Sequence, residues 1–246
     1  MDKMLYVMNS GAKAAMQRQE VLANNLANAS TVGFRAELHA IRSVPVTGSA
    51  ANTRAFALET TVGYNDQPGA LQPTGRSLDV AARGNAWFAV QSLDGTEAYT
   101  RNGAFDVNAE GVLTLRNGLP VQGEGGPITI APNASVEIAA DGTVSATVSA
   151  AGARPEVVGR LKLVEPTAPL QRGTDGLFRP AGGQELPASD AARVQSGVLE
   201  GSNVSPVEAM VAMIAAARQF EQQMKLMQTA EKQEQSASKL LTTGMG

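Results

Sequence analysis

The C-terminal stretch over residues 205–241 constrains the fold most, because it predicts one long, uninterrupted helix. Ser205 and Glu208 have the spacing of a capping box. Pro206 stands at the first helical position, where its fixed φ suits a helix and its missing N–H removes no bond. No Gly or Pro occurs from residue 207 to 243. At a rise of about 1.5 Å per residue, the stretch forms a rod roughly 50 Å long.

Apolar side chains recur along this helix at alternating spacings of three and four residues, which places them on one face. They are Met210, Met213, Ala217, Phe220, Met224 and Met227. The first half of the helix, from residue 210 to 217, is apolar nearly all the way round. One partner helix cannot cover such a surface, so we expect this half to pack among several neighbours, some of them from other chains.

The N-terminus carries a second apolar stripe, on a helix predicted for residues 3–28. Its members are Met1, Leu5, Met8, Ala12, Ala15, Gln19, Leu22, Leu26 and Ala29. Pro is absent before Pro45, and Gly11 is the one weak point of the helix. Gln19 is the polar member of the stripe. It either fixes the register of a helix pair or simply faces solvent.

The positions of the two stripes favour a particular architecture. A single stripe is typical of a surface helix on a globular core. Here the stripes lie at opposite ends of the chain, with no helical signal between them. We therefore predict an α+β fold, in which paired N- and C-terminal α-helices, coiled-coil-like, flank a mainly antiparallel β domain inserted in the middle. The helical domain is predicted to comprise residues 1–35 and 205–246.

The middle of the chain divides into two parts. Residues 36–69 contain several turn-forming residues and no dominant period, so we expect an extended connector with a short strand or two. Residues 70–201 are predicted to form the β domain. Asp-Gly or Asn-Gly dipeptides, which are hairpin signals, recur there at 94–95, 102–103, 117–118, 141–142 and 175–176. Strand-like runs lie at 77–82, 86–91, 98–100, 112–115, 128–130, 135–138, 143–148 and 157–164. This punctuation predicts an antiparallel barrel or sandwich.

Two details of the β domain are left to the structure. Trp87 and Phe88 are neighbours on one predicted strand and therefore point to opposite faces. We expect one of them in the core and the other at a domain or subunit junction, and the sequence does not say which. Residues 170–187 are rich in Gly and Pro and are predicted to form an exposed loop.

Composition argues against several classes of function. Lys and Arg number 20 against 23 Asp and Glu, a net charge of −3 without a basic cluster, which disfavours nucleic acid as a partner. There is no Cys, so thiol and disulfide chemistry are excluded. No stretch approaches the ~20 apolar residues that span a bilayer, and the N-terminus lacks the pattern of a cleaved secretion signal.

No constellation of residues predicts catalysis, a cofactor or a metal. His39 is the only histidine, and a lone histidine lacks the partners of a base or a metal site. The Asp-Gly pairs do not have calcium-loop spacing and are interpreted as turns. Glu231 and Glu234 could be taken for a paired-carboxylate site, but the polar residues after them favour a solvated helix end. We predict that the chain is not an enzyme.

The predicted stop of the first helix carries the most specific sequence. Asn28 and Ser30 compete with the helical backbone, and Gly33 can adopt a conformation that a Cβ disfavours. The run N-L-A-N-A-S-T-V-G-F-R closely resembles the signature of the flagellar basal-body rod, hook and hook-associated proteins. The signature positions are Asn25, Leu26, Ala27, Asn28, Ser30, Thr31, Gly33, Phe34 and Arg35.

Both ends of the chain extend this resemblance. The chain begins M-D-K-M-L-Y-V-M-N-S-G-A, and S-N-V-S-P-V-E-A-M-V-A-M-I, at residues 202–214, looks like the family's C-terminal helix. The length of the chain and its N-terminal sequence are most similar to those of the proximal rod subunits of that family. The resemblance implies a structural subunit of the bacterial flagellar rod, which crosses the periplasm, and export through the flagellar type III apparatus without a cleaved signal. It implies, as partners, other copies of the chain and other proximal and distal rod proteins.

From the residues we expect a subunit that polymerises through its terminal helices, stacked with a rotation that does not close. The expected subunit contacts are Leu5, Met8, Leu22, Leu26, Met210, Met213, Ile214, Ala217, Phe220, Met224 and Met227. Helices that order only on assembly should be protease-sensitive in a lone subunit.

Two other functions remain open from the sequence. One is a carbohydrate- or cell-wall-binding β module on an oligomerising coiled coil, which would use exposed rings from Tyr99, Trp87, Phe88 and Phe105. The other is an enzyme that cuts cell wall, which the missing acid/base constellation disfavours.

Overall fold

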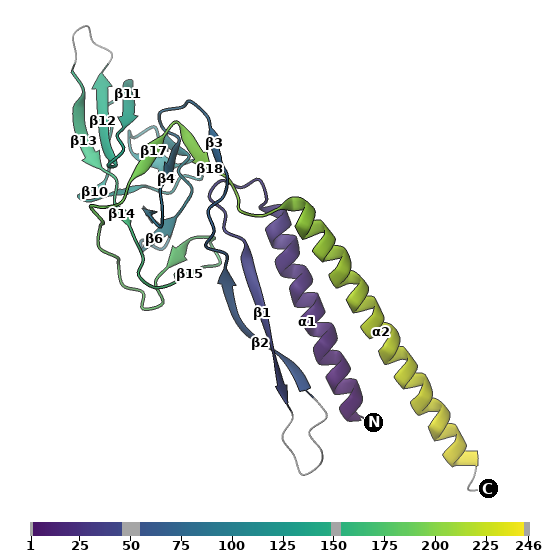
Figure 1. The fold of residues 1–246 in the computed structure, drawn as a ribbon. Helices are drawn as coiled ribbons and strands as arrows, with labels where there is room; N and C mark the ends of the chain where they lie inside the picture. Colours follow the sequence, from purple (N-terminus) through teal and green to yellow (C-terminus); the bar gives the residue numbers. More distant parts are fainter. Residues whose placement is uncertain (1, 46–54, 149–153, 244–246) are drawn as a thin grey trace. The chain divides into compact units, whose positions relative to one another are not determined.

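Two compact units make up the chain in the computed structural model, which describes residues 2–45, 55–148 and 154–243 (Figure 1). The helical unit contains residues 1–29, 36–65 and 204–246, and the β unit contains residues 30–35 and 66–203. The chain therefore crosses between the units more than once, and each unit is assembled from separate parts of the sequence.

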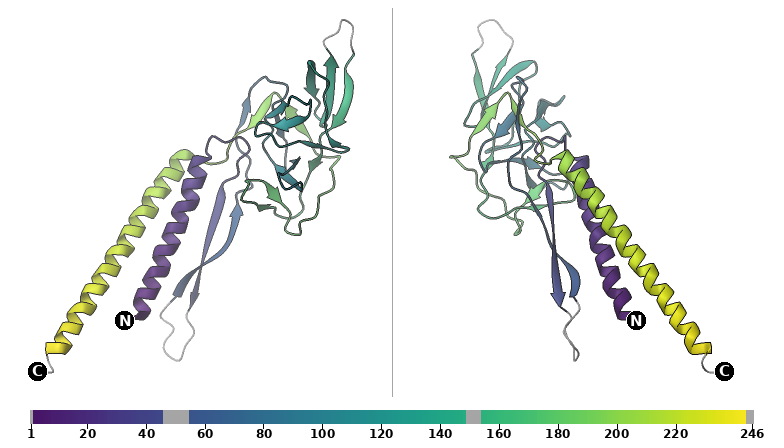
Figure 2. Two further views of the ribbon diagram at one scale, coloured as in Figure 1. Left: turned by 180° about the vertical axis from the view of Figure 1, so that it is seen from behind. Right: turned by 45° about the vertical axis from the view of Figure 1, so that its right-hand side comes forward.

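Two antiparallel helices, α1 (Asp2–Ala27) and α2 (Pro206–Thr243), lie side by side in the helical unit (Figures 1 and 2). The start of α2 follows the capping pattern of the sequence, because the amide of Glu208 donates to Ser205 Oγ at 3.5 Å and the amide of Ala209 donates to the Ser205 carbonyl at 3.0 Å. Both helices occupy their predicted ranges to within a residue or two.

A long hairpin of β1 (Glu37–Pro45) and β2 (Ala55–Tyr64) completes the helical unit. The strands pair antiparallel, with one bulge between His39 and Ile41. Both strands contact α1, so α1 lies between the hairpin and α2 (Figure 2). Much of the stretch 36–69, expected to be an extended connector, is thus a regular two-stranded sheet supported by a helix.

The β unit is made of short strands. They are β3 (Leu71–Pro73), β4 (Val80–Ala82), β5 (Trp87–Gln91), β6 (Glu97–Thr100), β7 (Phe105–Val107), β8 (Leu113–Leu115), β9 (Gln122–Gly123), β10 (Gly126–Pro127), β11 (Ala134–Ile138), β12 (Thr143–Val148), β13 (Glu156–Arg160), β14 (Leu163–Val164), β15 (Gln171–Arg172), β16 (Phe178–Arg179), β17 (Val194–Ser196) and β18 (Val198–Glu200). The largest sheet has the order β14-β5-β6-β16-β15, and a second has the order β11-β12-β13. Two-stranded sheets pair β17 with β4, β18 with β3, β7 with β8 and β10 with β9. Every strand pair in the described residues is antiparallel, as the turn pattern predicts.

Aromatic rings fill both faces of the central sheet. Phe88 meets Phe105 edge to face, with their centroids 5.2 Å apart. Trp87, on the other face of the same strand, is equally buried and packs on Phe178 at a centroid distance of 4.7 Å. Both neighbours therefore lie in the interior, and neither sits at an exposed junction. Phe178 comes from the segment 170–187, which was predicted to be an exposed loop. The prediction is wrong for residues 170–179, because β15 and β16 join the central sheet, whereas residues 180–187 contain no strand and are mostly exposed.

The dipeptide turns behave as predicted with one exception. Gly95, Gly118, Gly142 and Gly176 have φ between 78° and 88°, the left-handed region that favours glycine. Gly103 has no such φ. It must be glycine because a Cβ there would overlap the carbonyl oxygen of Val80.

Candidate assembly interface

The first turns of α2 expose four large apolar side chains on one side. Val207, Met210, Val211 and Ile214 have exposed fractions between 51% and 71%. Their spacing of three and four residues aligns them along the helix. We call these four residues the outer apolar face.

The outer apolar face ends where the same side of α2 becomes charged. Arg218, Glu221 and Lys225 continue the helical spacing beyond Ile214, and all three are exposed. A contiguous apolar patch bounded by charged residues is typical of a contact surface, whereas singly exposed apolar residues are common on any protein.

The opposite side of α2 packs in the helical unit, and its most buried residues are small. Ala209 and Ala216 are buried, and Met213, Phe220 and Met227 are half-buried in the same row. Positions 209, 213, 216, 220 and 227 follow heptad spacing, so this row lies about half a helical turn from the outer apolar face. Helices approach more closely where the contact residues are small.

One contact locates this packing on α1. Gln223, which belongs to the inner row of α2, lies against Gly11, where a Cβ would be 2.6 Å from its Oε1. Ala12 and Ala15, the members of the predicted stripe that follow Gly11, are buried. The glycine that weakens α1 as a helix thus admits the side chain of its partner.

The structure divides the predicted contact residues between these two sides. Met210 and Ile214 belong to the outer apolar face. The half-buried members are Leu22, Leu26, Met213, Ala217, Phe220, Met224 and Met227. The side chains of Leu5 and Met8 lie outside the described residues.

Asn25 of the signature joins the end of α1 to the start of β1. Its side-chain amide donates to the carbonyl of Glu37 at 2.9 Å, and its Oδ1 accepts the amide of Glu37 at 2.8 Å. This pair of bonds imitates a neighbouring β-strand. Asn24 donates to the Glu37 carboxylate at 2.8 Å, and Asn28 donates back to the carbonyl of Asn24 at 2.9 Å. The asparagines of this region therefore fix the reversal from helix to hairpin.

The last residues of the signature belong to the β unit. Gly33 has a φ of 69°, and a Cβ there would overlap the backbone between Arg101 and Asn102. Phe34 is buried, and the guanidinium of Arg172 lies 4.5 Å from its ring centroid. The signature residues therefore have specific structural roles both at the end of α1 and in the β unit.

Arg35 ends the signature in a buried ionic cluster that sequence analysis missed. Arg35 Nη2 lies 2.8 Å from Glu200 Oε1, and Arg101 Nη2 lies 2.6 Å from Glu200 Oε2. All three side chains are 2% exposed, and we call them the Glu200 cluster. One signal for it was available, because Glu200 shares a strand face with the apolar Val198 and so follows it inward.

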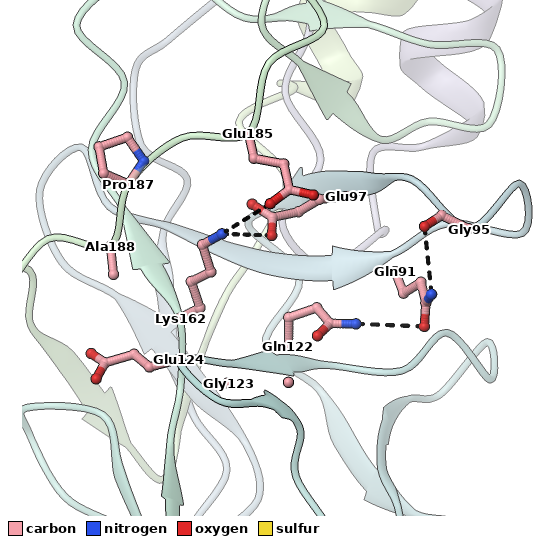
Figure 3. A pocket seen from close by; sticks show the side chains of 11 residues that line it. Gln91, Gly95, Glu97, Gln122, Gly123, Glu124, Lys162, Glu185, Pro187 and Ala188 are labelled. Carbon is pink, nitrogen blue, oxygen red and sulfur yellow. Dashed lines mark hydrogen bonds and ion pairs between the residues drawn. The ribbon is translucent and has the colours of Figure 1, made fainter.

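A polar pocket of about 450 Å³ opens on the β unit (Figure 3). Lys162 Nζ lies 2.6 Å from Glu97 and 3.9 Å from Glu185 across it. Gln91 and Gln122, which also line it, approach each other at 3.5 Å. None of the lining residues in the described part of the chain is aromatic. Small-molecule sites are usually lined by apolar and aromatic groups, so this pocket lacks their usual composition.

The aromatic residues that carbohydrate binding would require are in the interior. Tyr99, Trp87, Phe88 and Phe105 are at most 1% exposed. Burial raises the pKa of the Tyr99 hydroxyl, which donates to Glu97 at 2.7 Å. These rings hold the β unit together and offer no surface on which a sugar could stack.

Among the residues that the structure describes, no helix is long and apolar enough to cross a membrane. The same residues contain no group of three or more His, Asp or Glu placed to hold a metal ion.

Three family models match successive parts of the chain. The model described as flagella basal body rod protein matches residues 5–35, which include the signature. The model described as flagellar hook protein FlgE/F/G D1 domain matches residues 81–146 of the β unit. The model described as flagellar basal body rod FlgEFG protein C-terminal matches residues 195–240, which include the outer apolar face.

Curated relatives match over nearly the whole chain. The flagellar basal-body rod protein FlgF of Salmonella typhimurium is 47% identical, over 98% of this chain and 99% of its own length. FlgF of Escherichia coli is 46% identical, over 98% of this chain and 99% of its own length. The flagellar basal-body rod protein FlgG of Buchnera aphidicola subsp. Acyrthosiphon pisum is 29% identical, over 96% of this chain and 98% of its own length.

Proposed function

This chain belongs to the flagellar basal-body rod protein family and is a structural subunit of the basal-body rod, and on that premise we propose that it polymerises through its helical unit. The observation that carries the proposal is the outer apolar face of α2. We propose that this face is buried against helices of neighbouring subunits in the assembled rod, forming part of a drive shaft that crosses the periplasm.

The size of the outer apolar face decides how strong one contact can be. Burying each of its four side chains contributes about 1–2 kcal/mol, so one subunit gains about 4–8 kcal/mol from this face. Bringing two molecules together costs an estimated 4–15 kcal/mol or more. A single pairwise contact is therefore weak, and stable assembly requires several neighbours at once, as at the end of a growing polymer.

The composition of the face suits neighbours that are similar but not identical. Methionine adapts its shape to different surfaces, and Met210 is one of the four exposed side chains of the outer apolar face. We propose that the neighbours are other copies of this chain and other proximal and distal rod proteins. We also propose that the chain reaches the rod through the flagellar export apparatus, without a cleaved signal, and that it has no enzymatic activity.

A matched pair of substitutions tests the interface. Ile214→Asp places a carboxylate in the outer apolar face, and Lys225→Asp places one on the same side about three turns further on, beyond the apolar patch. Each variant replaces the wild-type gene in a motile bacterium. Swimming and the amount of the chain in purified basal bodies are then measured, and thermal unfolding of each purified variant is recorded.

We expect Ile214→Asp to lose motility and to be missing from basal bodies, while its unfolding matches the wild type, because residue 214 is already exposed in the single chain. Lys225→Asp should swim and assemble. Normal incorporation of Ile214→Asp would overturn the interface, and equal loss in both variants would show that the patch is not the determinant.

A further inference from the structure

The chain passes into or out of the β unit at several points, and one set of hydrogen bonds joins the segments next to these points. The chain enters or leaves this unit between residues 29 and 30, 35 and 36, 65 and 66, and 203 and 204. Residues 30–35, 66–69 and 200–203 are therefore the exit segments of the β unit, and all three belong to the unit itself.

Backbone bonds join the exit segments directly. The amide of Gly33 donates to the carbonyl of Glu200 at 2.8 Å, and the amide of Asn203 donates to the carbonyl of Phe34 at 3.2 Å. The side chain of Asn203 donates to the carbonyl of Gln67 at 2.8 Å. Residues far apart in sequence are thus adjacent where the chain leaves the β unit.

The carboxylate of Glu200 connects the same segments a second time. Its Oε1 pairs with Arg35 at 2.8 Å and accepts the amide of Gly69 at 3.1 Å. Its Oε2 accepts two bonds from Arg101, from Nε at 2.9 Å and from Nη2 at 2.6 Å. Arg35 also donates to the carbonyl of Gln67. The carboxylate of Glu200, which belongs to the exit segment 200–203, therefore contacts both other exit segments, 30–35 through Arg35 and 66–69 through Gly69.

Arg101 fastens this arrangement to the core. Its guanidinium donates to the carbonyls of Ala82 at 3.0 Å and Gly84 at 3.1 Å, and also to the carbonyl of Ala86. Ala82 ends β4, and Ala86 precedes β5 of the central sheet. Arg101 thus continues the connection from Glu200 into the strands that form the interior.

We propose that the Glu200 cluster is a mechanical tether that fixes the exit segments to one another and to the core of the β unit. A force that enters the unit by one exit is then shared by the others and by the central sheet. The residues act by positioning: Glu200 holds Arg35 and Arg101, and these hold the segments.

The energetics of buried ion pairs favour a role in fixing the exit segments over a role in raising the stability of the fold. A buried ion pair often stabilises a fold no more than apolar residues of the same volume, because both charges must lose their hydration. What such a cluster supplies is a fixed geometry, since removal of one partner leaves an unpaired buried charge. Two arginines on one carboxylate make that geometry strict.

Amide exchange measures the tether without reference to motility. The wild-type chain is compared with Glu200→Gln, which leaves two arginines uncompensated, and with Arg35→Lys, which keeps the charge but loses the planar fork that reaches both Gln67 and Glu200. The control is Glu97→Gln, because Glu97 forms a largely buried ion pair with Lys162 away from the exits. Ala89 and Gln91, whose amides donate to Lys162 and Pro120, report on the core.

We expect exchange at the amides of Gly33, Gly69 and Asn203 to be faster by about tenfold or more in both tether variants, while the amides of Ala89 and Gln91 keep their rates. If Glu200→Gln does not fold, Arg35→Lys alone decides. The tether is overturned if these three amides exchange at wild-type rates in Arg35→Lys. It is also overturned if the exchange rates of the core amides rise equally, or if Glu97→Gln shows the same pattern as the tether variants.

Transmission of force rests on the rod function proposed above, whereas the coupling of the exits does not. Arg35→Lys is therefore also tested in motile cells, in medium of increasing viscosity. Variant subunits that assemble and swim in dilute medium should lose speed earlier than wild type as viscosity rises. Normal swimming at high viscosity, in a variant whose exits exchange faster, overturns the transmission of force and leaves the coupling intact.

Discussion

Gln223 of α2 lies over Gly11 of α1 so closely that a methyl group on Gly11 would be 2.6 Å from its Oε1. The atoms that would clash are the far end of a flexible side chain. Alanine also favours a helix over glycine by about 1 kcal/mol. We therefore expect Gly11→Ala to leave the helical unit as stable as before or more stable by up to about 1 kcal/mol. A leucine at the same position cannot be accommodated by moving one amide.

Chemical denaturation followed by far-ultraviolet circular dichroism separates these outcomes. Gly11→Leu should lower the free energy of unfolding by about 1–3 kcal/mol, the usual cost of overpacking. Equal behaviour of the two variants would mean that α1 and α2 do not pack together at Gly11 in solution.

Asn25→Ala should destabilise the helical unit much more than Asn24→Ala. Asn25 is 7% exposed and makes both of its bonds to the backbone of Glu37, so its loss leaves a partly buried amide and carbonyl without these partners. Such a loss costs about 1–3 kcal/mol. Asn24 makes an exposed bond to the Glu37 carboxylate, worth at most about 1 kcal/mol. Parallel denaturant titrations of the two variants measure the difference, and similar midpoints would contradict the strand-like role of Asn25.

The purified wild-type chain should be monomeric at micromolar concentration. The outer apolar face alone supplies about 4–8 kcal/mol, which does not exceed the cost of association by enough for a stable dimer. Sedimentation velocity over a range of concentrations measures this directly. Limited proteolysis of the dilute monomer adds a second readout, with residues 1–28 and 207–241 expected to be cut first. A tight dimer would show that the contact is stronger than its area allows.

Acid should weaken the β unit partly through Asp175. The hydrogen bond from Arg179, 2.7 Å long, lowers the pKa of Asp175 below its ordinary value of 3.8. A carboxyl with a lowered folded pKa stabilises the fold above 3.8, and this contribution is lost as the pH falls through the folded pKa. The side chain is partly exposed, so the contribution is about 1 kcal/mol or less.

Asp175→Asn removes this contribution at neutral pH. The difference in free energy of unfolding between wild type and variant should therefore shrink as the pH falls from neutral to about pH 3. A difference that stays constant over this range would exclude the Asp175–Arg179 pair as its source.

The helices were predictable because a few neighbouring residues determine where each helix begins and ends. Ser205 with Pro206 marks the start of α2, and the absence of Gly and Pro after it leaves nothing to end the helix early. Half of the strands of the β unit were predictable for a similar reason, since Asp-Gly and Asn-Gly turns lie between many of them. These features depend on a few neighbouring residues, so one sequence suffices. The predicted strand at 128–130 is wrong, because this run forms only an isolated bridge through Thr129.

The inner row of α2 shows where local pattern is ambiguous. The spacing of apolar residues selects Met210 and Ala217, whereas the buried positions are Ala209 and Ala216, one residue earlier. Both rows have heptad spacing. At positions 209 and 210 the smaller residue, Ala209, is the buried one, because a small contact residue permits close approach to α1. That preference depends on the partner surface and cannot be read from α2 alone.

The hairpin β1–β2 and the Glu200 cluster were missed because they depend on distant parts of the chain. The hairpin packs along α1, and that support is not visible in its irregular sequence. Glu200, Arg35 and Arg101 are separated by 65 residues or more, and each alone looks like an ordinary charged surface residue. Only the fold brings them together.

The late position of Glu200 has a consequence for how the chain matures. A polypeptide is made from its N-terminus, so Arg35 and Arg101 exist long before the carboxylate that neutralises them. A fragment that stops short of residue 200 would have to bury two cations with no counter-charge, and it should remain unfolded and open to degradation. A closed β unit therefore contains residue 200 and comes from a chain that was translated almost as far as the start of α2 at Pro206.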